Sequence, residues 1–233
     1  MGRFVVGGLF AALLWALTAA PASAAPAAPP VGRCIAELAR SGSLGRAVNP
    51  SVAHFVAGTD GDDDFTDLLT TGTDVVCGFG GDDFVLSLQE GDIYFGGGGN
   101  NEVGYLYGGT FFAGDGRNMV AIMTGGTLHG GEGSAYVTTM QGGTFNVGSG
   151  TGSVYGLSGG TFNGTDGVEA VTKMYGGTFN AAGGDDFVGF MYGGMFAGGD
   201  GDDSVWYLAG GTFSGGAGDD TVSCVCGGTF LPD

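Results

Sequence analysis

Basic side chains are scarce in this sequence. Its 233 residues include only 6 Lys and Arg against 24 Asp and Glu, which gives a formal net charge of −18 at pH 7. A surface of this sign repels nucleic acid and anionic membranes, and it attracts cations. The composition therefore predicts cations as partners and no nucleic-acid partner.

Proline is as scarce as the basic residues, with 6 residues, whereas glycine is abundant, with 54. A collagen-like chain is excluded because it needs a high proline content with glycine at every third place. A disordered acidic chain is also excluded, because 43% of the residues are hydrophobic and 12% are aromatic, enough to build a core. Of the glycine-rich classes, the composition therefore leaves a folded repeat protein.

Long apolar runs are confined to the first residues of the chain. Arg3, an apolar run to about Ala20 and the small residues Ala22, Ser23 and Ala24 predict a signal peptide over 1–24 and a secreted, extracellular protein. Removing Arg3 leaves 5 basic and 24 acidic residues, a charge of 5 − 24 = −19. No later run is long enough for a membrane span.

Glycine pairs recur with a fixed period of seventeen residues, as expected of a solenoid in which each turn packs on its neighbours. The sequence predicts a tether and a short helical cap over 25–52 and a solenoid domain over 53–233. Small insertions near Glu90 and around 70–72 bring the first turns into phase. The pairs begin at Gly108, Gly125, Gly142, Gly159, Gly176, Gly193, Gly210 and Gly227.

Three apolar columns repeat in phase with these glycines. Glycine interrupts each segment before a helix could form, so short strands are expected and the fold class is all-β. The prediction is a parallel β-solenoid, a β-roll or β-helix of about ten turns and about 45 to 50 Å long. The columns run from Tyr94 through Phe111, Leu128 and Phe145 to Phe230; from Phe65 through Val85 and Val103 to Val222; and from Leu68 through Leu88 and Leu106 to Val225.

A glycine and aspartate motif occupies one half of several turns. Residues 198–206 and 215–223 both fit G-G-x-G-x-D-x-U-x, where U is a large apolar residue, and looser copies begin at Gly58, Gly78 and Ala181. Glycine permits tight left-handed turns, and aspartate supplies a hard anionic oxygen. Two stacked carboxylates about 5 Å apart repel by about 3 kcal/mol at an effective dielectric constant of 20, so a cation would favour folding.

This motif resembles the calcium-binding nonapeptide of the RTX, or haemolysin-type, repeat family, here in a variant with a seventeen-residue turn. The resemblance implies a β-roll that binds Ca²⁺ between adjacent turns. Only one half of each turn carries the motif, so at most one row of ions is expected, and Asn101, Asn118, Ala135, Gly152 and Glu169 interrupt that row. The candidate ligands are Asp60, Asp63, Asp83, Asp186, Asp200, Asp203 and Asp220.

Three other interpretations compete with calcium binding. Gly-Asp runs also form ordinary solvated turns. A threonine column is expected to face outward and resembles the hydroxyl rows of ice-binding proteins, so an ice- or surface-binding adhesin is the alternative function. A polysaccharide-active enzyme is less favoured and no enzyme is predicted, because Arg117 and Lys173 are the only basic residues in the repeats and His54 and His129 are isolated in the sequence.

The four cysteines suggest disulfides in an exported chain. Pairing Cys34 with Cys77 would tie the cap to an early turn, whereas Cys224 and Cys226 could pair, remain free or link two molecules. The C-terminal edge could add strands from another copy, so self-association joins cell-surface or other extracellular molecules among the partners to be considered.

Overall fold

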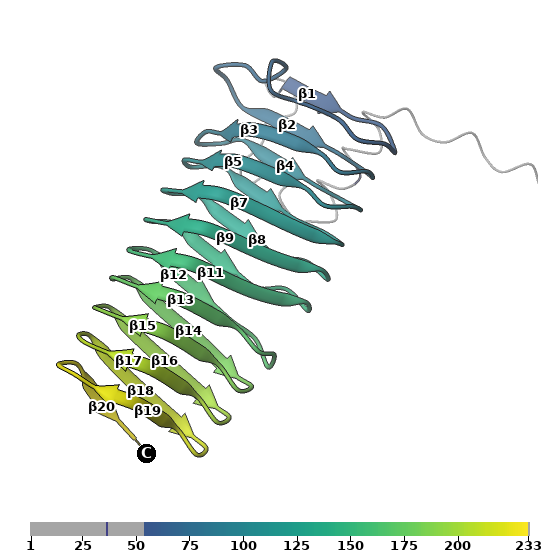
Figure 1. Cartoon of the computed structure of the whole chain (residues 1–233). Coiled ribbons are helices and arrows are strands. Elements are labelled where there is room, and N and C mark those ends of the chain that lie inside the picture. Colours follow the sequence, from purple (N-terminus) through teal and green to yellow (C-terminus); the bar gives the residue numbers. More distant parts are fainter. Residues whose placement is uncertain (1–35, 37–53, 233) are drawn as a thin grey trace, which may run out of the picture.

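The computed structural model describes residues 54–232 and Ala36. The chain forms a rod of stacked turns, each running once through both of two parallel sheets (Figure 1). The prediction of an all-β parallel solenoid of about ten turns is confirmed. The predicted signal peptide, tether and helical cap lie outside the described residues apart from Ala36, which is helical.

Over residues 54–232 the first sheet has 11 strands, and all of its neighbouring strands pair in parallel. Its strands are β1 (His54–Ala57), β2 (Asp74–Cys77), β4 (Ile93–Phe95), β6 (Thr110–Phe112), β8 (Thr127–His129), β10 (Thr144–Asn146), β12 (Thr161–Asn163), β14 (Thr178–Gly183), β16 (Met195–Asp200), β18 (Thr212–Ala217) and β20 (Thr229–Leu231).

In the described part of the chain the second sheet has 9 strands, and it is also parallel throughout. A bridge between Asp64 and Phe84 continues it into the first turn. Its strands are β3 (Phe84–Leu88), β5 (Glu102–Leu106), β7 (Arg117–Met123), β9 (Ser134–Met140), β11 (Thr151–Leu157), β13 (Ala170–Met174), β15 (Phe187–Met191), β17 (Ser204–Leu208) and β19 (Thr221–Val225).

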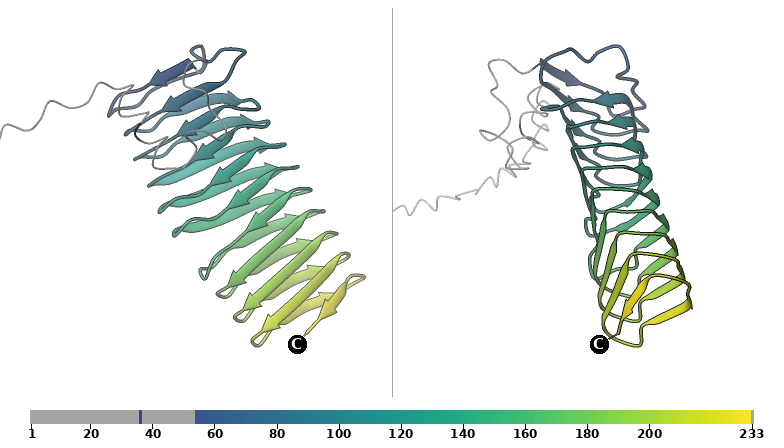
Figure 2. Two further views of the ribbon diagram at one scale, coloured as in Figure 1. Left: turned by 180° about the vertical axis from the view of Figure 1, so that it is seen from behind. Right: turned by 90° about the vertical axis from the view of Figure 1, so that its left-hand side faces the viewer.

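The register follows the glycine period. Phe145 pairs with Phe162 and Phe162 with Phe179, a step of seventeen residues at each turn. The first two turns are longer, because His54 pairs with Asp74, 20 residues later, and Val75 pairs with Ile93, 18 residues later. The two predicted insertions account for this extra length. Because both sheets keep one register, identical positions lie one above another along the rod (Figure 2).

The core consists of these stacked positions. The rings of Phe162 and Phe179 lie 4.7 Å apart, centroid to centroid, and those of Phe179 and Phe196 lie 4.8 Å apart. These distances match the spacing of neighbouring strands, so each ring packs on the same ring of the next turn. The column of Val85, Val103 and Val120 faces the rings and is fully buried.

Two residues assigned to the apolar columns are not in the core. Leu68 is 51% exposed, because it lies within the longer loop of the first turn, and its neighbour Leu69 packs against the core instead. Val225 is 57% exposed because it lies on β19, the outermost strand of its sheet. The predicted inward position is therefore wrong for Leu68, whereas Val225 keeps the predicted register with the buried Leu208 and is exposed at the end of the sheet.

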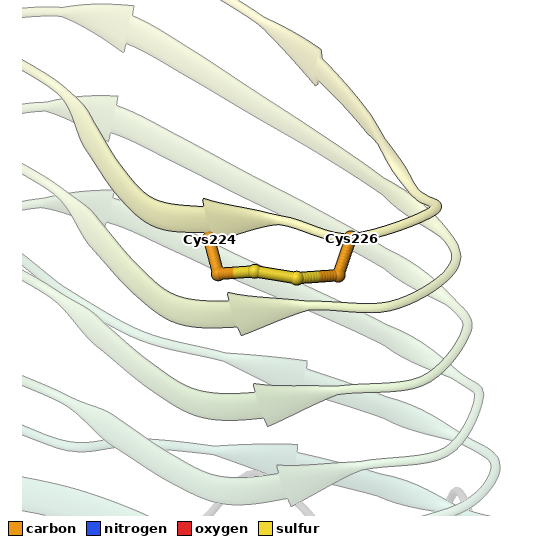
Figure 3. The surroundings of a disulfide bond; sticks show 2 residues. All are labelled: Cys224 and Cys226. Carbon is orange, nitrogen blue, oxygen red and sulfur yellow. A yellow bond between two sulfur atoms is a disulfide. The ribbon is translucent and has the colours of Figure 1, made fainter.

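A disulfide links Cys224 and Cys226, which lie on and directly after β19 (Figure 3). Cys77 is also disulfide-bonded. Its predicted partner, Cys34, lies outside the described residues. The Cys224–Cys226 bond settles one of the pairings that the sequence left open.

Candidate metal centre

The aspartates of the repeated motif point into the solenoid. They form a column that runs alongside the stacked rings, and we call it the inner acidic column. Asp83 and Asp186 are 1% exposed and Asp203 is 0% exposed, whereas Asp63 and Asp220, one at each end, are half-buried. The apolar residue two places after Asp203, Val205, is buried as expected. Five of the seven predicted site residues therefore share one column.

One oxygen of each buried carboxylate joins two turns. The backbone N–H of Asp186 donates to Oδ1 of Asp203 at 2.8 Å, and that of Asp203 donates to Oδ1 of Asp220 at 2.9 Å. At the other end, Asp63 N–H donates to Oδ1 of Asp83 at 3.0 Å. Each carboxylate thus satisfies a backbone group of the preceding turn, and the column acts as a polar ladder beside the core.

The second oxygen of the most deeply buried carboxylates has no partner. Oδ2 of Asp83, of Asp186 and of Asp203 is buried and accepts no hydrogen bond. An unsatisfied buried oxygen costs about 1 to 3 kcal/mol, and more when it is charged. Each of these oxygens therefore needs a proton or a cation.

Glycine makes room for the second oxygens of Asp83 and Asp203. A Cβ atom built on Gly198 would collide with Oδ2 of Asp203 and would lie 2.5 Å from the carbonyl oxygen of Gly215, in the next turn. Gly78 has the same relationship to Oδ2 of Asp83 and to the carbonyl oxygen of Gly96. A carboxylate oxygen and a carbonyl oxygen from successive turns therefore converge beside one glycine. Two oxygens in this arrangement attract a positive ion or share a hydrogen.

Burial raises the pKa of three carboxyls. Loss of solvation raises the pKa of Asp83 to about 6, with repulsion from Asp63 adding to the shift. It raises the pKa of Asp186 to about 7 and that of Asp203 to about 6, where neighbouring carboxylates also contribute. Hydrogen bonds from the backbone oppose these shifts. Near neutral pH the column is thus poised between binding protons and binding a cation.

The middle of the column is built without buried carboxylates. Asn101 accepts from the Asp83 N–H, and its own amide donates to Asn118 at 3.0 Å. The next two members are Ala135 and Gly152. These residues leave no buried charge, so the central turns have no need of an ion.

A second, exposed acidic column runs beside the first, and its hydrogen bonds between turns were not predicted from the sequence. Asp185 Oδ1 accepts from the N–H of Asp202, whose own Oδ1 accepts from Asp219 at 2.8 Å. These outer carboxylates bond toward the following turn, whereas the inner ones bond toward the preceding turn. The repeated Asp-Asp dipeptides, which directly precede β15, β17 and β19, were the available signal, since adjacent residues of an extended backbone point to opposite sides.

The two remaining predicted ligands, Asp60 and Asp200, are exposed and lie outside the inner column. Within residues 54–232, no group of three or more His, Cys, Asp or Glu side chains is close enough to hold a metal ion. A bound ion would therefore have to combine one or two carboxylates with backbone carbonyl oxygens.

The other candidate groups have structural partners. His54 is not isolated, because its Nδ1 lies 2.7 Å from Oδ1 of the buried Asp74. His129 stacks on Phe112, and burial lowers its pKa. The exposed Tyr175 stacks on Tyr192, so each ring covers one face of the other.

Comparisons with known proteins do not assign the chain to a family. No family model, no curated protein and no solved structure matches it. Among the residues that the structure describes, no helix is long and apolar enough to cross a membrane.

Proposed function

We propose that this chain is a secreted calcium-binding β-solenoid in which Ca²⁺ neutralises the inner acidic column and stabilises the fold. The observation that carries the proposal is the set of buried, unpartnered oxygens on Asp83, Asp186 and Asp203. Hard oxygen ligands from carboxylates and carbonyl groups are those that calcium prefers. The resemblance of the glycine and aspartate motif to RTX repeats supports the same ion.

The residues fit such an ion at two separate places. Asp83 would hold one near the N-terminal end of the rod, and Asp186 and Asp203, with Asp220, would hold others near the C-terminal end. The ion would supply positive charge to carboxylates that otherwise lose their solvation in the fold. Extracellular calcium sites bind at about 10⁻⁴ to 10⁻³ M, so folding would be completed outside the cell.

Thermal melts of the purified protein test the proposal. Circular dichroism is recorded in EDTA, in millimolar calcium and in millimolar magnesium. We expect a higher melting temperature in calcium than in either other buffer, because magnesium gives up its water reluctantly. Identical melts in calcium and EDTA would refute calcium binding and leave the motif as plain turns.

A second candidate function rests on the threonine column. Thr144 pairs in register with Thr161, and Thr161 with Thr178, so a half-exposed hydroxyl row follows one face of the rod. An amide row of Asn146, Asn163 and Asn180 runs beside it, with Asn163 donating to Asn146 at 2.8 Å. An ice- or surface-binding adhesin would use this face. Replacing Thr144 and Thr161 with Val would then abolish inhibition of ice recrystallisation.

The proposal assigns no catalytic activity to the chain. A polysaccharide-active enzyme remains testable by release of reducing sugar from common plant and bacterial polysaccharides. Release that persists after purification would contradict the proposed role.

A further inference from the structure

Three loops of the rod satisfy a buried or half-buried carboxylate without an ion. They share the pattern T-x-G-x-D or T-x-G-x-E, and each has the same hydrogen bonds. The threonine N–H and hydroxyl both donate to the carboxylate four residues later, and the glycine N–H donates to the threonine hydroxyl. The loops are 59–63, 70–74 and 165–169.

The distances show how complete this capping is. Thr59 N lies 2.6 Å from Oδ2 of Asp63, and Thr70 N lies 2.8 Å from Oδ2 of Asp74. Thr165 N lies 3.1 Å from Oε2 of Glu169. The loop at Thr70 lies at the other edge of the rod from the acidic columns, so the arrangement belongs to the local sequence rather than to one location.

The loops with unpartnered oxygens lack this threonine. The residue four places before the carboxylate is Phe79 for Asp83, Ala182 for Asp186 and Gly199 for Asp203, with φ of 75°, 81° and 110°. In the Thr59 and Thr165 loops the equivalent residue does not have a positive φ. In residues 54–232, Phe79 and Ala182 are the only non-glycine residues with a positive φ. In these three loops, a left-handed residue four places before the carboxylate therefore occurs together with a second carboxylate oxygen that accepts no hydrogen bond.

We infer that the residue four places before each carboxylate decides whether a loop takes up a cation. Loops with threonine there are capped by their own hydrogen bonds and bind none, whereas the left-handed loops of Asp83, Asp186 and Asp203 bind one. This inference rests on the proposed calcium binding and makes it more specific. It removes Asp63 from the expected ligands, because Thr59 already donates twice to its second oxygen.

Two substitutions of one residue test the inference. Ala182→Thr introduces the capping residue ahead of Asp186 and creates the pattern T-x-G-x-D, because Gly184 is already in place. Ala182→Gly keeps the left-handed backbone and supplies no cap, so it is the matched control. The reciprocal change, Thr59→Gly, removes the hydroxyl donor to Oδ2 of Asp63 and admits the left-handed backbone that would turn the N–H of residue 59 away from the same oxygen.

The measurement is calcium stoichiometry by isothermal titration, with calcium chloride added to chelator-treated full-length protein. We expect Ala182→Thr to bind about one ion fewer than the unmodified protein, Ala182→Gly to bind the same number, and Thr59→Gly to bind about one more. Circular dichroism establishes that each variant is folded, and Thr59→Gly keeps the inference testable if Ala182→Thr does not fold.

The outcomes separate the inference from the function on which it rests. If the unmodified protein binds no calcium, the proposed function is wrong. If it binds calcium but Thr59→Gly and both Ala182 variants leave the number of ions unchanged, calcium binding stands and the capping rule is overturned. The rule is also overturned if Ala182→Gly loses an ion together with Ala182→Thr.

Discussion

The side chain of Val147 fills the space beside the α-carbon of Gly152, where other turns place a carboxylate beside a glycine. In the loop of Asp203 the order is reversed, with Gly198 first and the carboxylate five residues later. In these two turns the two positions are thus complementary in volume. Glycine at one position leaves room for a larger side chain at the other, as expected of a close-packed interior.

This complementarity predicts a strong effect of Gly152→Asp. The new carboxylate would meet Val147 and would be buried without a partner, so we expect a loss of about 3 kcal/mol or more in the free energy of unfolding. Urea denaturation followed by circular dichroism measures the change. A loss below about 1 kcal/mol would show that the loop rearranges to admit the side chain.

The double variant Val147→Gly with Gly152→Asp provides the control. It restores the order of glycine and carboxylate found in the loop of Asp203, so the two changes are expected to be less destabilising together than their sum. A coupling of about 1 to 3 kcal/mol would support direct contact. Strict additivity would contradict it, because it would mean that Val147 and Gly152 do not share one space.

The pKa shifts of the inner acidic column predict an unusual dependence of stability on pH. The pKa of Asp83 and of Asp203 is about 6 and that of Asp186 is about 7, all above the ordinary value of 3.8. The folded protein therefore binds more protons than the unfolded chain between about pH 4 and pH 7. In EDTA, the free energy of unfolding should fall as pH rises through this range, by an amount on the order of 3 kcal/mol per carboxyl.

Calcium should remove this dependence, because a bound cation holds the carboxylates in their ionised form. Urea denaturation between pH 4 and pH 8, with and without calcium, measures both slopes. Asp186→Asn serves as the control, since an amide does not titrate and the slope in EDTA should become shallower. Stability that rises from pH 4 to pH 7 in EDTA would show that the carboxyls are ionised without an ion.

The period of seventeen residues was sufficient to predict the register. It placed Phe162 over Phe179 and Val103 over Val120, and the structure pairs both. Leu68 could not be placed, because the inserted residues of the first turn break the phase and Leu69 takes the core position. The arrangement into two sheets could not be predicted from the period either. The repeat length fixes the number of residues per turn, but it does not determine the shape of the cross-section.

The site was predictable only in part. The offset between Asp203 and Val205 indicated an ordered loop, but it did not reveal that Asp203 is buried and accepts from the Asp186 N–H. That bond depends on the separation of turns, which only the assembled rod defines. The capping by Thr59 and Thr165 was visible in the sequence as threonine four residues before an acidic residue, a spacing typical of local side-chain to backbone bonds.

The stacked rings predict a further effect, on stability alone. Phe162 is fully buried between Phe145 and Phe179, at 4.8 and 4.7 Å between ring centroids. Phe162→Ala should therefore lower the free energy of unfolding by about 3 to 5 kcal/mol, with or without calcium. Phe230→Ala is the matched control, because Phe230 is half-buried and stacks on Phe213 alone among the ring contacts of the described residues. Equal losses for both variants would contradict a core that is packed most tightly at its centre.

Calcium removal should loosen the rod unevenly. The segment from Asn118 to Gly152 has no buried carboxylate in the inner acidic column, whereas the loops of Asp83, Asp186 and Asp203 each leave an oxygen unpartnered. Hydrogen exchange measured by mass spectrometry in calcium and in EDTA should show faster exchange in EDTA around 78–86 and 182–208. Exchange over 118–157 should change little, because no cation contributes to the stability of those turns. Uniformly faster exchange along the whole rod would mean that the turns unfold as one unit, so that ions at the two ends support the centre as well.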